Sequence, residues 1–445
     1  MTVIDELQDT LDSFPESNCY WVAYSGGCDS HVLLHALFSL SQLKSSAGKF
    51  EIAAVHVNHG LQQNADKWSL HCRKICDDLG VRFKLLKVNA AAKTGQSPEA
   101  AAREARYQAI SRFLPKNETL LVAHHQDDQA ETLLLQLLRG AGPRGLSAMP
   151  KMKLMAGNRV LRPFLGLAQQ TILEYAKQHQ LDWIEDPSNT DTRFDRNRIR
   201  HEVLPVMKQR WPYLSKTLAR VTQHQAEAAE CLRELAEEDW VKVKTTEDFK
   251  GLCISKLLQL SQPRQKNLLR YWIEQLNCFN AIDSTHLNRI LNEVIPAAID
   301  SQPAVKWQNT QVRRYRDILY VLDAKRINVS VKPQDWNIAN TIDLTDQRLV
   351  SREIVGKGIK QSLITDGIVN IRYRQGGERC QPSGRANHHT LKKLFQEWAV
   401  PPWKRSHIPL IYIKNEIVQI VGYCLCEPFA AGPGEQGISI ESEKL

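Results

Sequence analysis

The first 184 residues alternate short apolar, β-branched runs with longer amphipathic stretches. Four runs predict buried strands at 19–24, 50–57, 82–88 and 120–123, and helix-length segments lie between them at 30–43, 62–79 and 98–113. Strands that alternate with helices in this way are typical of a parallel sheet with helices on both faces. Such sheets bind ligands outside the carboxyl ends of their strands. Functional residues are therefore expected in the loops that follow the four strands.

The rest of the chain changes character. Charged side chains interleave with Ala and Leu over 213–240, helical patterns recur at 263–276 and 284–295, and a hairpin is expected near 311–322. We therefore expect an α/β domain over 1–215 and a mainly helical domain over 216–325. A connecting region over 326–365 would lead to a small mixed α/β domain over 366–445.

Charge and composition narrow the class of protein. Lys and Arg (58) outnumber Asp and Glu (49), so the net charge of +9 indicates an anionic partner, nucleic acid before membrane. An apolar share of 42% excludes wholesale disorder, and no run of 18 apolar residues predicts a membrane span. The N-terminus is acidic and unlike a secretory signal, so a cytoplasmic protein is expected. None of the ten cysteines forms a Cys-x-x-Cys pair, which leaves a zinc site or a disulfide framework without support.

The sharpest motif directly follows the first predicted strand and opens a helix. It reads Ser25-Gly26-Gly27-Cys28-Asp29-Ser30. Adjacent glycines let the backbone approach a ligand, and the amides of a helix N-terminus attract a polyphosphate. No Gly-Lys-Ser/Thr follows, so nothing is aimed at a γ-phosphate. The alternative is a glycine-rich turn in which Asp29 or Ser30 merely caps the helix.

A second motif follows the fourth predicted strand and begins His124-His125-Gln126-Asp127-Asp128. If a helix starts near Asp127, Asp128 and Glu131 share one face, where two carboxylates would bind a metal or an amine. His124 is a candidate for contact with phosphate. An acidic first turn that only complements the helix dipole is the alternative.

Arginines gather at two further places. Arg103 and Arg106 share one face of the predicted helix 98–113, where an arginine could neutralise charge that develops on an α-phosphate. Arg193, Arg196, Arg198 and Arg200 fall within eight residues, a density that suits phosphate contacts. Solvated basic helix faces are the alternative at both places.

The terminal block carries a local positive charge. Residues 366–410 contain eight Lys or Arg and three Asp or Glu, interleaved with aromatic residues. Basic and aromatic side chains together suit backbone contacts and base stacking on RNA. The alternative is a small basic module that only stabilises the whole chain.

The Ser-Gly-Gly-x-Asp-Ser string resembles the phosphate loop of the PP-loop ATP pyrophosphatase superfamily, which cleaves ATP between its α- and β-phosphates. With the His-His-x-Asp-Asp-Gln-x-Glu-Thr string, Arg139-Gly-x-Gly142, Glu185-Asp-Pro-Ser-Asn189, Arg196-Asn-x-Ile-Arg200 and the end block, the chain resembles the tRNA(Ile)-lysidine synthetase family. The resemblance extends over almost the whole chain and is weakest in the helical middle.

The resemblance implies a reaction and its participants. ATP would adenylate C2 of the wobble cytidine of the isoleucine tRNA with a CAU anticodon, and free L-lysine would displace AMP to give lysidine. Ser25, Gly26, Gly27, Cys28, Asp29 and Ser30 would hold the departing pyrophosphate, and Asp29 would help to hold Mg²⁺. The implied catalytic residues are Asp29, Arg103, Arg106, His124, Asp128 and Glu131.

Lysine and tRNA would use separate groups of residues. The lysine ammonium, with a pKa of about 10.4, must lose a proton before it attacks, and Asp128 and Glu131 could hold it or relay that proton. The expected tRNA-binding residues are Arg196, Arg198, Arg200, Arg379, Lys392, Lys393, Lys404 and Arg405. No membrane partner is expected, and a homodimer is left open.

Two other functions remain as alternatives. A tRNA thiolase of the same superfamily would need paired cysteines or an iron–sulfur cluster, whereas Cys72 and Cys76 are expected on a helix away from the loop ends. A non-catalytic RNA-binding protein on a decayed nucleotide-binding scaffold would not be expected to keep Ser25, Asp29, Asp128 and Glu131.

Overall fold

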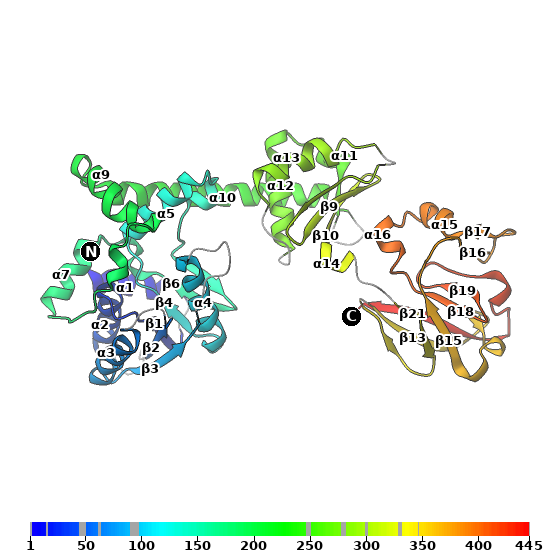
Figure 1. Cartoon of the computed structure of the whole chain (residues 1–445), viewed down its shortest axis with the longest axis horizontal. Helices are drawn as coiled ribbons and strands as arrows, with labels where there is room; N and C mark the ends of the chain where they lie inside the picture. The colour runs from blue at the N-terminus through cyan, green and yellow to red at the C-terminus, as the bar shows by residue number, and fades with distance from the viewer. Residues whose placement is uncertain are drawn as a thin grey trace. The chain divides into compact units, whose positions relative to one another are not determined.

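The computed structural model describes residues 2–14, 17–43, 50–60, 64–89, 98–245, 251–276, 282–298, 301–327, 332–345 and 347–444. The chain divides into two compact units, residues 1–234 and 235–445 (Figure 1). None of the helices in these ranges is long and apolar enough to cross a membrane.

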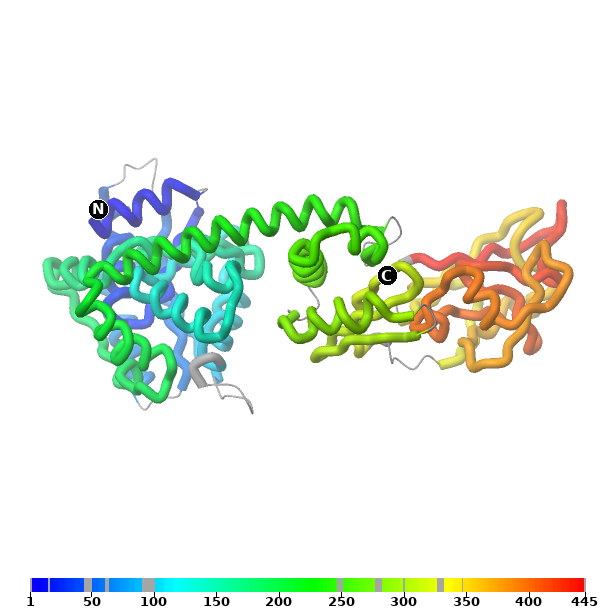
Figure 2. The backbone as a smooth tube through the Cα atoms, turned by 90° about the horizontal axis from the view of Figure 1, so that it is seen from above, coloured from blue at the N-terminus to red at the C-terminus, as the bar shows by residue number. Residues whose placement is uncertain are grey.

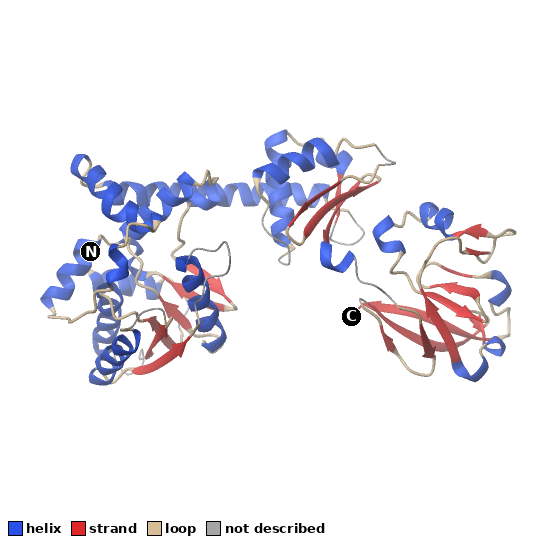
Figure 3. Ribbon diagram, viewed as in Figure 1, coloured by secondary structure: helices blue, strands red, loops and turns tan. Residues whose placement is uncertain are grey.

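A six-stranded sheet forms the centre of the first unit (Figure 3). Its order is β3-β2-β1-β4-β6-β5, and every neighbouring pair is parallel except β5 with β6, which forms an antiparallel hairpin at one edge. The strands are β1 (Cys19–Ala23), β2 (Glu51–Asn58), β3 (Arg82–Lys87), β4 (Thr119–Leu121), β5 (Met152–Met155) and β6 (Asn158–Leu161).

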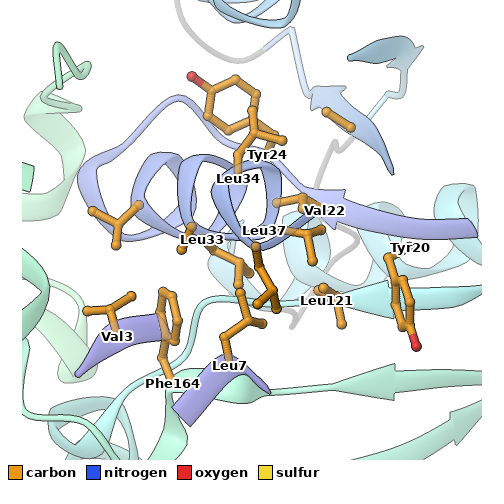
Figure 4. Packing of buried hydrophobic residues seen from close by; sticks show 14 of the residues in the cluster. Val3, Leu7, Tyr20, Val22, Tyr24, Leu33, Leu34, Leu37, Leu121 and Phe164 are labelled. Carbon is orange, nitrogen blue, oxygen red and sulfur yellow. The ribbon is translucent and has the colours of Figure 1, made fainter. Parts of the chain in front are cut away.

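Helices cover both faces of this sheet because successive strand residues point to opposite sides. Tyr20 and Val22 of β1 pack into the core shared with α1 (Val3–Asp12), α2 (Cys28–Leu43), α3 (Ala65–Asp78) and α7 (Gln169–Gln178) (Figure 4). Trp21, between them, packs on the other face with Ile110 of α4 (Pro98–Phe113). The apolar strands are thus buried on both faces of the sheet, as is usual for parallel strands.

The strands and helices expected from the sequence pattern are confirmed in type and position. Each expected strand overlaps β1 to β4, and the expected helices correspond to α2, α3 and α4. Residues 62 and 63 of the second expected helix lie outside the described residues. The pattern predicted them because strands buried on both faces read as short continuous apolar runs, whereas amphipathic helices repeat their apolar residues every three to four positions.

A helical layer closes the first unit beside α5 (Gln126–Leu138). Ala130 of α5 packs with Ile199, Leu204 and Leu214. These residues come from a π-helical segment (Ile199–Val203), α9 (Leu204–Arg210) and α10 (Leu214–Val243), a long continuous helix in Figure 2. Shorter helices in this unit are α6 (Pro143–Leu146), Pro163–Gly166, Pro187–Thr190 and α8 (Asp195–Arg198).

The second unit begins with helices on an antiparallel sheet of order β7-β10-β9-β8. The expected hairpin is present as β9 and β10, and the fully buried Trp272 of α12 lies in the core between the helices and the sheet. The elements are β7 (Gly251–Cys253), α11 (Ile254–Leu257), α12 (Gln262–Gln275), α13 (Ser284–Arg289), the π-helical Ile290–Val294, β8 (Ala304–Trp307), β9 (Thr310–Tyr315), β10 (Ile318–Asp323) and α14 (Ala324–Ile327).

The end of the chain forms two larger sheets and a two-stranded one. Their orders are β11-β15-β18-β19-β20, β12-β13-β21-β14 and β16-β17. The elements are β11 (Gln334–Asn337), β12 (Ile342–Asp343), β13 (Gln347–Val355), β14 (Ile359–Lys360), Gln361–Leu363, Thr365–Gly367, β15 (Ile368–Arg372), β16 (Arg379–Cys380), β17 (His389–Thr390), α15 (Leu391–Glu397), α16 (Pro402–Arg405), β18 (Leu410–Ile413), β19 (Glu416–Ile420), β20 (Cys424–Leu425), Glu427–Phe429 and β21 (Gln436–Lys444).

The segment 326–365 differs from the expected connecting region. It contains four strands, β11 to β14, and each pairs within the two larger sheets at the end of the chain. In β13, residues 347–355 pair along their whole length with 436–444. The pairing joins segments about ninety residues apart, and only Leu349 of the nine residues in β13 is buried, so its local pattern is weak.

Candidate active site

The phosphate-binding loop lies between β1 and α2, at the carboxyl end of the sheet. Gly26 has a φ of +87°, and a Cβ atom there would lie 2.8 Å from Ile184 Cδ1 and 2.9 Å from Cys72 Sγ. Ser30 Oγ accepts from the amide of Ser25 at 3.2 Å and donates to the carbonyl of Gly27 at 3.0 Å. Only glycine fits this backbone, and the serines hold the loop open around the first amides of α2.

Cys72 lies closer to the loop than expected. The sequence suggested that Cys72 and Cys76 lie away from the loop ends, whereas the Cys72 sulfur is packed beneath Gly26. Both side chains are fully buried on α3, and burial raises the pKa of each thiol to about 12. They are packing residues, because a buried thiol that stays protonated is a poor nucleophile. Burial also raises the pKa of the Cys28 thiol in the loop itself to about 12.

His125 joins the phosphate loop to the acidic helix, and sequence reasoning did not assign it a role. Its buried ring begins α5, where Nδ1 accepts from the amide of Asp127 at 3.3 Å and Asp128 Oδ2 accepts from the His125 amide at 3.0 Å. Its Nε2 lies 3.6 Å from Asp29 Oδ2 and 3.5 Å from Asp128 Oδ2. Burial lowers the pKa of His125, but Asp128 and Asp29 outweigh burial and raise it.

Asp128 and Glu131 occupy one face of α5, as their spacing predicts, and two arginines neutralise them. Arg196 contacts Asp128 Oδ1 and Glu131 Oε2, both at 2.7 Å. Arg200 contacts Glu131 Oε1 at 2.5 Å and Asp128 Oδ1 at 3.2 Å. Glu131 is fully buried, and Asp128 is nearly so. Burial raises the pKa of Asp128, yet the charges of His125 and Arg196 hold it well below its usual range.

The three arginines expected to bind tRNA in this segment therefore face different ways. Arg196 and Arg200, four residues apart, share the face that meets the carboxylates, and Arg198 points away and pairs with Glu202 at 3.5 Å. The spacing along the helical segment 195–203 explains the split, because residues four apart share a face and those two apart do not.

His124 belongs to a separate, cationic group. Its Nδ1 accepts from Nε of Arg162 at 3.2 Å, and the buried Arg162 also donates to the carbonyl of Pro150 at 2.8 Å. Burial lowers the pKa of His124 to about 3, and the charges of Arg162, Arg196 and Arg103 act in the same direction. His124 is thus a neutral imidazole, and Arg103 is close enough to influence it.

The two arginines of α4, Arg103 and Arg106, contact different partners. Arg103 lies over the ring of Tyr107, with its guanidinium carbon 5.4 Å from the ring centre. Arg106 turns toward His59 after β2, where its Nε lies 3.4 Å from His59 Nε2. The charge of Arg103 is among those that lower the pKa of His124.

Asp127 ties the helical layer to α5. Its Oδ1 accepts from Lys208 Nζ of α9 at 2.5 Å and from the hydroxyl of Ser215 in α10. Burial raises the pKa of Asp127, but these two donors outweigh it and lower the pKa. Asp127 is therefore a structural residue, whereas its neighbour Asp128 faces the site.

Four residues that sequence reasoning missed thus shape the site: His125, Arg162, Lys208 and Ser215. For two of these residues the sequence contained a feature that could have identified them. His125 precedes Asp128 by three residues, the spacing of a reciprocal helix cap. Arg162 follows a short apolar run, at the carboxyl end of a strand. No local sequence feature identifies Lys208 and Ser215, because their partner, Asp127, lies about eighty residues earlier in the chain.

The end of the chain exposes four of the eight residues expected to bind tRNA. Arg379, Lys392, Lys393 and Lys404 are exposed. Arg405 is buried instead, where it donates to the carbonyl of Val400 at 2.9 Å and to the hydroxyl of Tyr315 at 3.3 Å. Its position suits a structural role.

Three family models match successive parts of the chain. The PP-loop domain matches residues 1–207, the TilS substrate binding domain matches 252–320 and the TilS substrate C-terminal domain matches 369–442. The first of these contains the glycine-rich loop, the acidic helix and both arginines that meet it, whereas Lys208 and Ser215 lie just beyond its end.

Curated relatives match nearly end to end. The tRNA(Ile)-lysidine synthase of Coxiella burnetii is 40% identical over 439 residues, 98% of this chain and 96% of its own. That of Methylococcus capsulatus is 39% identical over 438 residues, 97% of this chain and 98% of its own. Among solved structures, the U34-tRNA thiolase NcsA from Methanococcus maripaludis covers 51% of this chain and 78% of its own, with 16% identity and a TM-score of 0.44. With the phosphate loop, the acidic helix and matches over almost its full length, this chain belongs to the tRNA(Ile)-lysidine synthase family.

Proposed function

We propose that this chain is the ligase that forms lysidine on isoleucine tRNA at the expense of ATP. The observation that carries the proposal is the link from Asp29 through His125 to Asp128 at one edge of the sheet. This link connects a loop that can bind the phosphates of ATP with a pair of carboxylates that can bind an amine. A reaction with two half-steps, adenylation and then attack by an amine, needs both groups within reach of one cytidine.

The phosphate loop and the cationic group serve the first half-step. Ser25 to Ser30 hold the departing pyrophosphate through backbone amides and the α2 N-terminus. Arg103 and Arg162, whose charges both act on the neutral His124, stabilise charge on the α-phosphate while the cytidine oxygen attacks. Arg106 is a weaker candidate than Arg103, because its guanidinium is turned toward His59.

Mg²⁺ fits this loop with few protein ligands. Among the described residues, no group of three or more His, Cys, Asp or Glu could hold a metal ion by itself. Asp29, partly exposed at the start of α2, offers one carboxylate. Mg²⁺ commonly binds one or two carboxylates together with substrate phosphates and water. Asp29 would hold the ion, which would neutralise phosphate charge when bound.

Asp128 and Glu131 serve the second half-step by binding the ammonium of free L-lysine. They already hold two guanidiniums, so a lysine ammonium must compete with Arg196 and Arg200 for these oxygens, and its charge is compensated when one guanidinium moves away. The low pKa of Asp128 makes it a weak base, which favours holding the cation over taking its proton.

The tRNA contributes the wobble cytidine from an unpaired anticodon loop, where a base leaves its stack at least cost. We infer that Arg379, Lys392, Lys393 and Lys404 hold the tRNA backbone, since all four are exposed and basic. Arg196 and Arg200 approach RNA phosphates only if they leave their carboxylates, and Arg198 is free of those carboxylates already.

Incorporation of radiolabelled lysine tests the whole proposal. Acid-precipitable label should appear with isoleucine tRNA of CAU anticodon, require ATP and release AMP and pyrophosphate. Asp29→Asn, which keeps the side-chain shape, should lower the rate about 10²–10³-fold. Label that appears without ATP contradicts the proposal, as does label that never appears. A thiol donor in place of lysine is the control for the thiolase alternative.

A further inference from the structure

Two large aromatic side chains stand out in solvent at the corner between α9 and α10. Trp211 is 57% exposed and Tyr213 is 80% exposed, on either side of Pro212. Rings of this size are usually buried over most of their surface, and exposed pairs of them mark surfaces that bind something.

The corner is held rigidly and close to the active site. Lys208 before it and Ser215 after it both contact Asp127 Oδ1, one residue from Asp128. The amide of Trp211 donates to Met207 at 2.9 Å, and the buried Leu214 packs against α5. Tyr213 is two residues from Ser215, so their Cα atoms are at most about 7 Å apart. The backbone that carries the rings is therefore anchored to α5 beside Asp128.

The chain segment that carries the rings contains only positive charges. Residues 203–226 contain Lys208, Arg210, Lys216 and Arg220 and no Asp or Glu. Lys208 is bound to Asp127, and the other three are exposed. An apolar surface of another protein would not need these positive charges. Single-stranded RNA needs both features, because its bases stack on aromatic side chains and its phosphates bind basic ones.

We propose that residues 210–216, the corner platform, stack the unpaired anticodon-loop nucleotides that neighbour the reacting cytidine. The inference rests on the proposed function and adds to it a surface within the first unit. When the cytidine leaves its stack, its neighbours lose a partner, and Trp211 and Tyr213 replace that partner. Arg210 and Lys216 meet the adjoining phosphates. Loss of one ring should weaken loop binding about five- to a hundredfold.

A fluorescent anticodon stem-loop tests the platform in the full-length chain. The anticodon adenine is replaced by 2-aminopurine, whose emission falls when it stacks on an aromatic ring. Parent protein should quench the probe, and Trp211→Ala and Tyr213→Ala should bind it more weakly and quench it less. Trp211→Phe and Tyr213→Phe retain a ring and should keep most of both effects. Leu70→Ala, which alters a side chain 66% exposed on α3, is the matched control and should change neither.

The outcomes separate this inference from the proposed function. Lysine incorporation by the parent, together with unchanged loop binding and quenching in both alanine variants, would overturn the platform alone. Sedimentation that shows a parent dimer lost in both alanine variants, with loop binding intact, would also overturn it and assign the corner to self-association. Quenching that depends on the rings in a parent that never incorporates lysine would support the platform and refute the proposed reaction. Circular dichroism confirms that each variant is folded.

Discussion

At the scale of single residues, the site is governed by which charges neutralise one another. Two carboxylates, Asp128 and Glu131, face two guanidiniums in a nearly dry environment, and His125 connects the first carboxylate to Asp29. A buried pair of this kind contributes little net stability when complete, but breaking it leaves an uncompensated charge. Binding and stability are therefore coupled in the same side chains.

Removal of one carboxylate charge should affect both properties. For Asp128→Asn and Glu131→Gln we expect the KM for lysine to rise about 10- to 100-fold, or adenylated tRNA to accumulate, because the ammonium loses a charged partner. Glu131→Gln should also lower the free energy of unfolding by up to about 3–5 kcal/mol, since Arg196 and Arg200 lose their fully buried partner. Steady-state kinetics and urea unfolding measure the two effects.

The matched control is Glu202→Gln, because Glu202 pairs with Arg198 on the surface. An exposed pair contributes about 0–1 kcal/mol, so this variant should resemble the parent in both assays. If Asp128→Asn and Glu131→Gln also resemble the parent in every step, the acidic turn only complements the helix dipole.

The low pKa of His124 leads to a second prediction at this scale, which concerns the dependence of stability on pH. Its pKa of about 3 means that the folded protein keeps the ring neutral throughout the physiological range. The unfolded chain takes up this proton near pH 6.5, so the stability that His124 contributes is lost as the pH falls from about 6.5 toward 3. His124→Gln should flatten the fall in unfolding free energy over that window. A His124 resonance that titrates near pH 6.5 in NMR would contradict this.

At the scale of elements, the phosphate loop depends on a backbone that only glycine adopts without strain. Gly26 combines a φ of +87° with a close approach to Ile184 and Cys72, and the amide of Ile184 donates to the Gly26 carbonyl at 2.9 Å. An added methyl group would therefore displace the side chains of Ile184 and Cys72 or strain that hydrogen bond.

Gly26→Ala should consequently disable ATP binding as well as destabilise the first unit. Gly80→Ala separates the two causes, because Gly80 also has a positive φ, +65°, but an added Cβ there meets nothing within 4 Å. Both variants should lose about 1–2 kcal/mol from backbone strain, and only Gly26→Ala should lose more and weaken ATP binding. Thermal unfolding and calorimetric titration with ATP measure these effects. Equal losses in the two variants, with ATP affinity intact, would show that the approach to Ile184 is unimportant.

At the scale of the whole molecule, the proposed function assigns part of the net positive charge to the interaction with tRNA. Arg379, Lys392, Lys393 and Lys404 are exposed at the end of the chain, whereas Arg405 is buried against Val400 and Tyr315. The first four are suited to phosphate contacts, and Arg405 is suited to holding the fold.

Replacing the four exposed residues together with Ala should weaken tRNA binding and flatten its salt dependence. Each lost phosphate contact should reduce the log–log salt slope by roughly 0.7–0.9, which filter binding at several salt concentrations measures. ATP binding should survive, because its loop lies in the other unit. Arg405→Ala should lower the melting temperature instead. An unchanged salt slope in the fourfold variant would assign these side chains to a merely solvated surface.

The local pattern of the sequence determined the α/β order of the first unit, the position of the phosphate loop and the shared face of Asp128 and Glu131. Each of these depends on residues within one strand, turn or helix, where periodicity and glycine act directly. The hairpin at β9 and β10 was predicted for the same reason.

Only the tertiary structure decided which groups meet. Arg196 and Arg200 pair with carboxylates 65 to 72 residues away, Lys208 and Ser215 hold Asp127, and β13 pairs with the far end of the chain. A basic residue has the same local pattern whether it faces RNA, as proposed for Lys392, or a buried carboxylate, as Arg196 does. Long-range packing fixes that choice, because burial makes an unpaired charge too unfavourable and selects its partner across the fold.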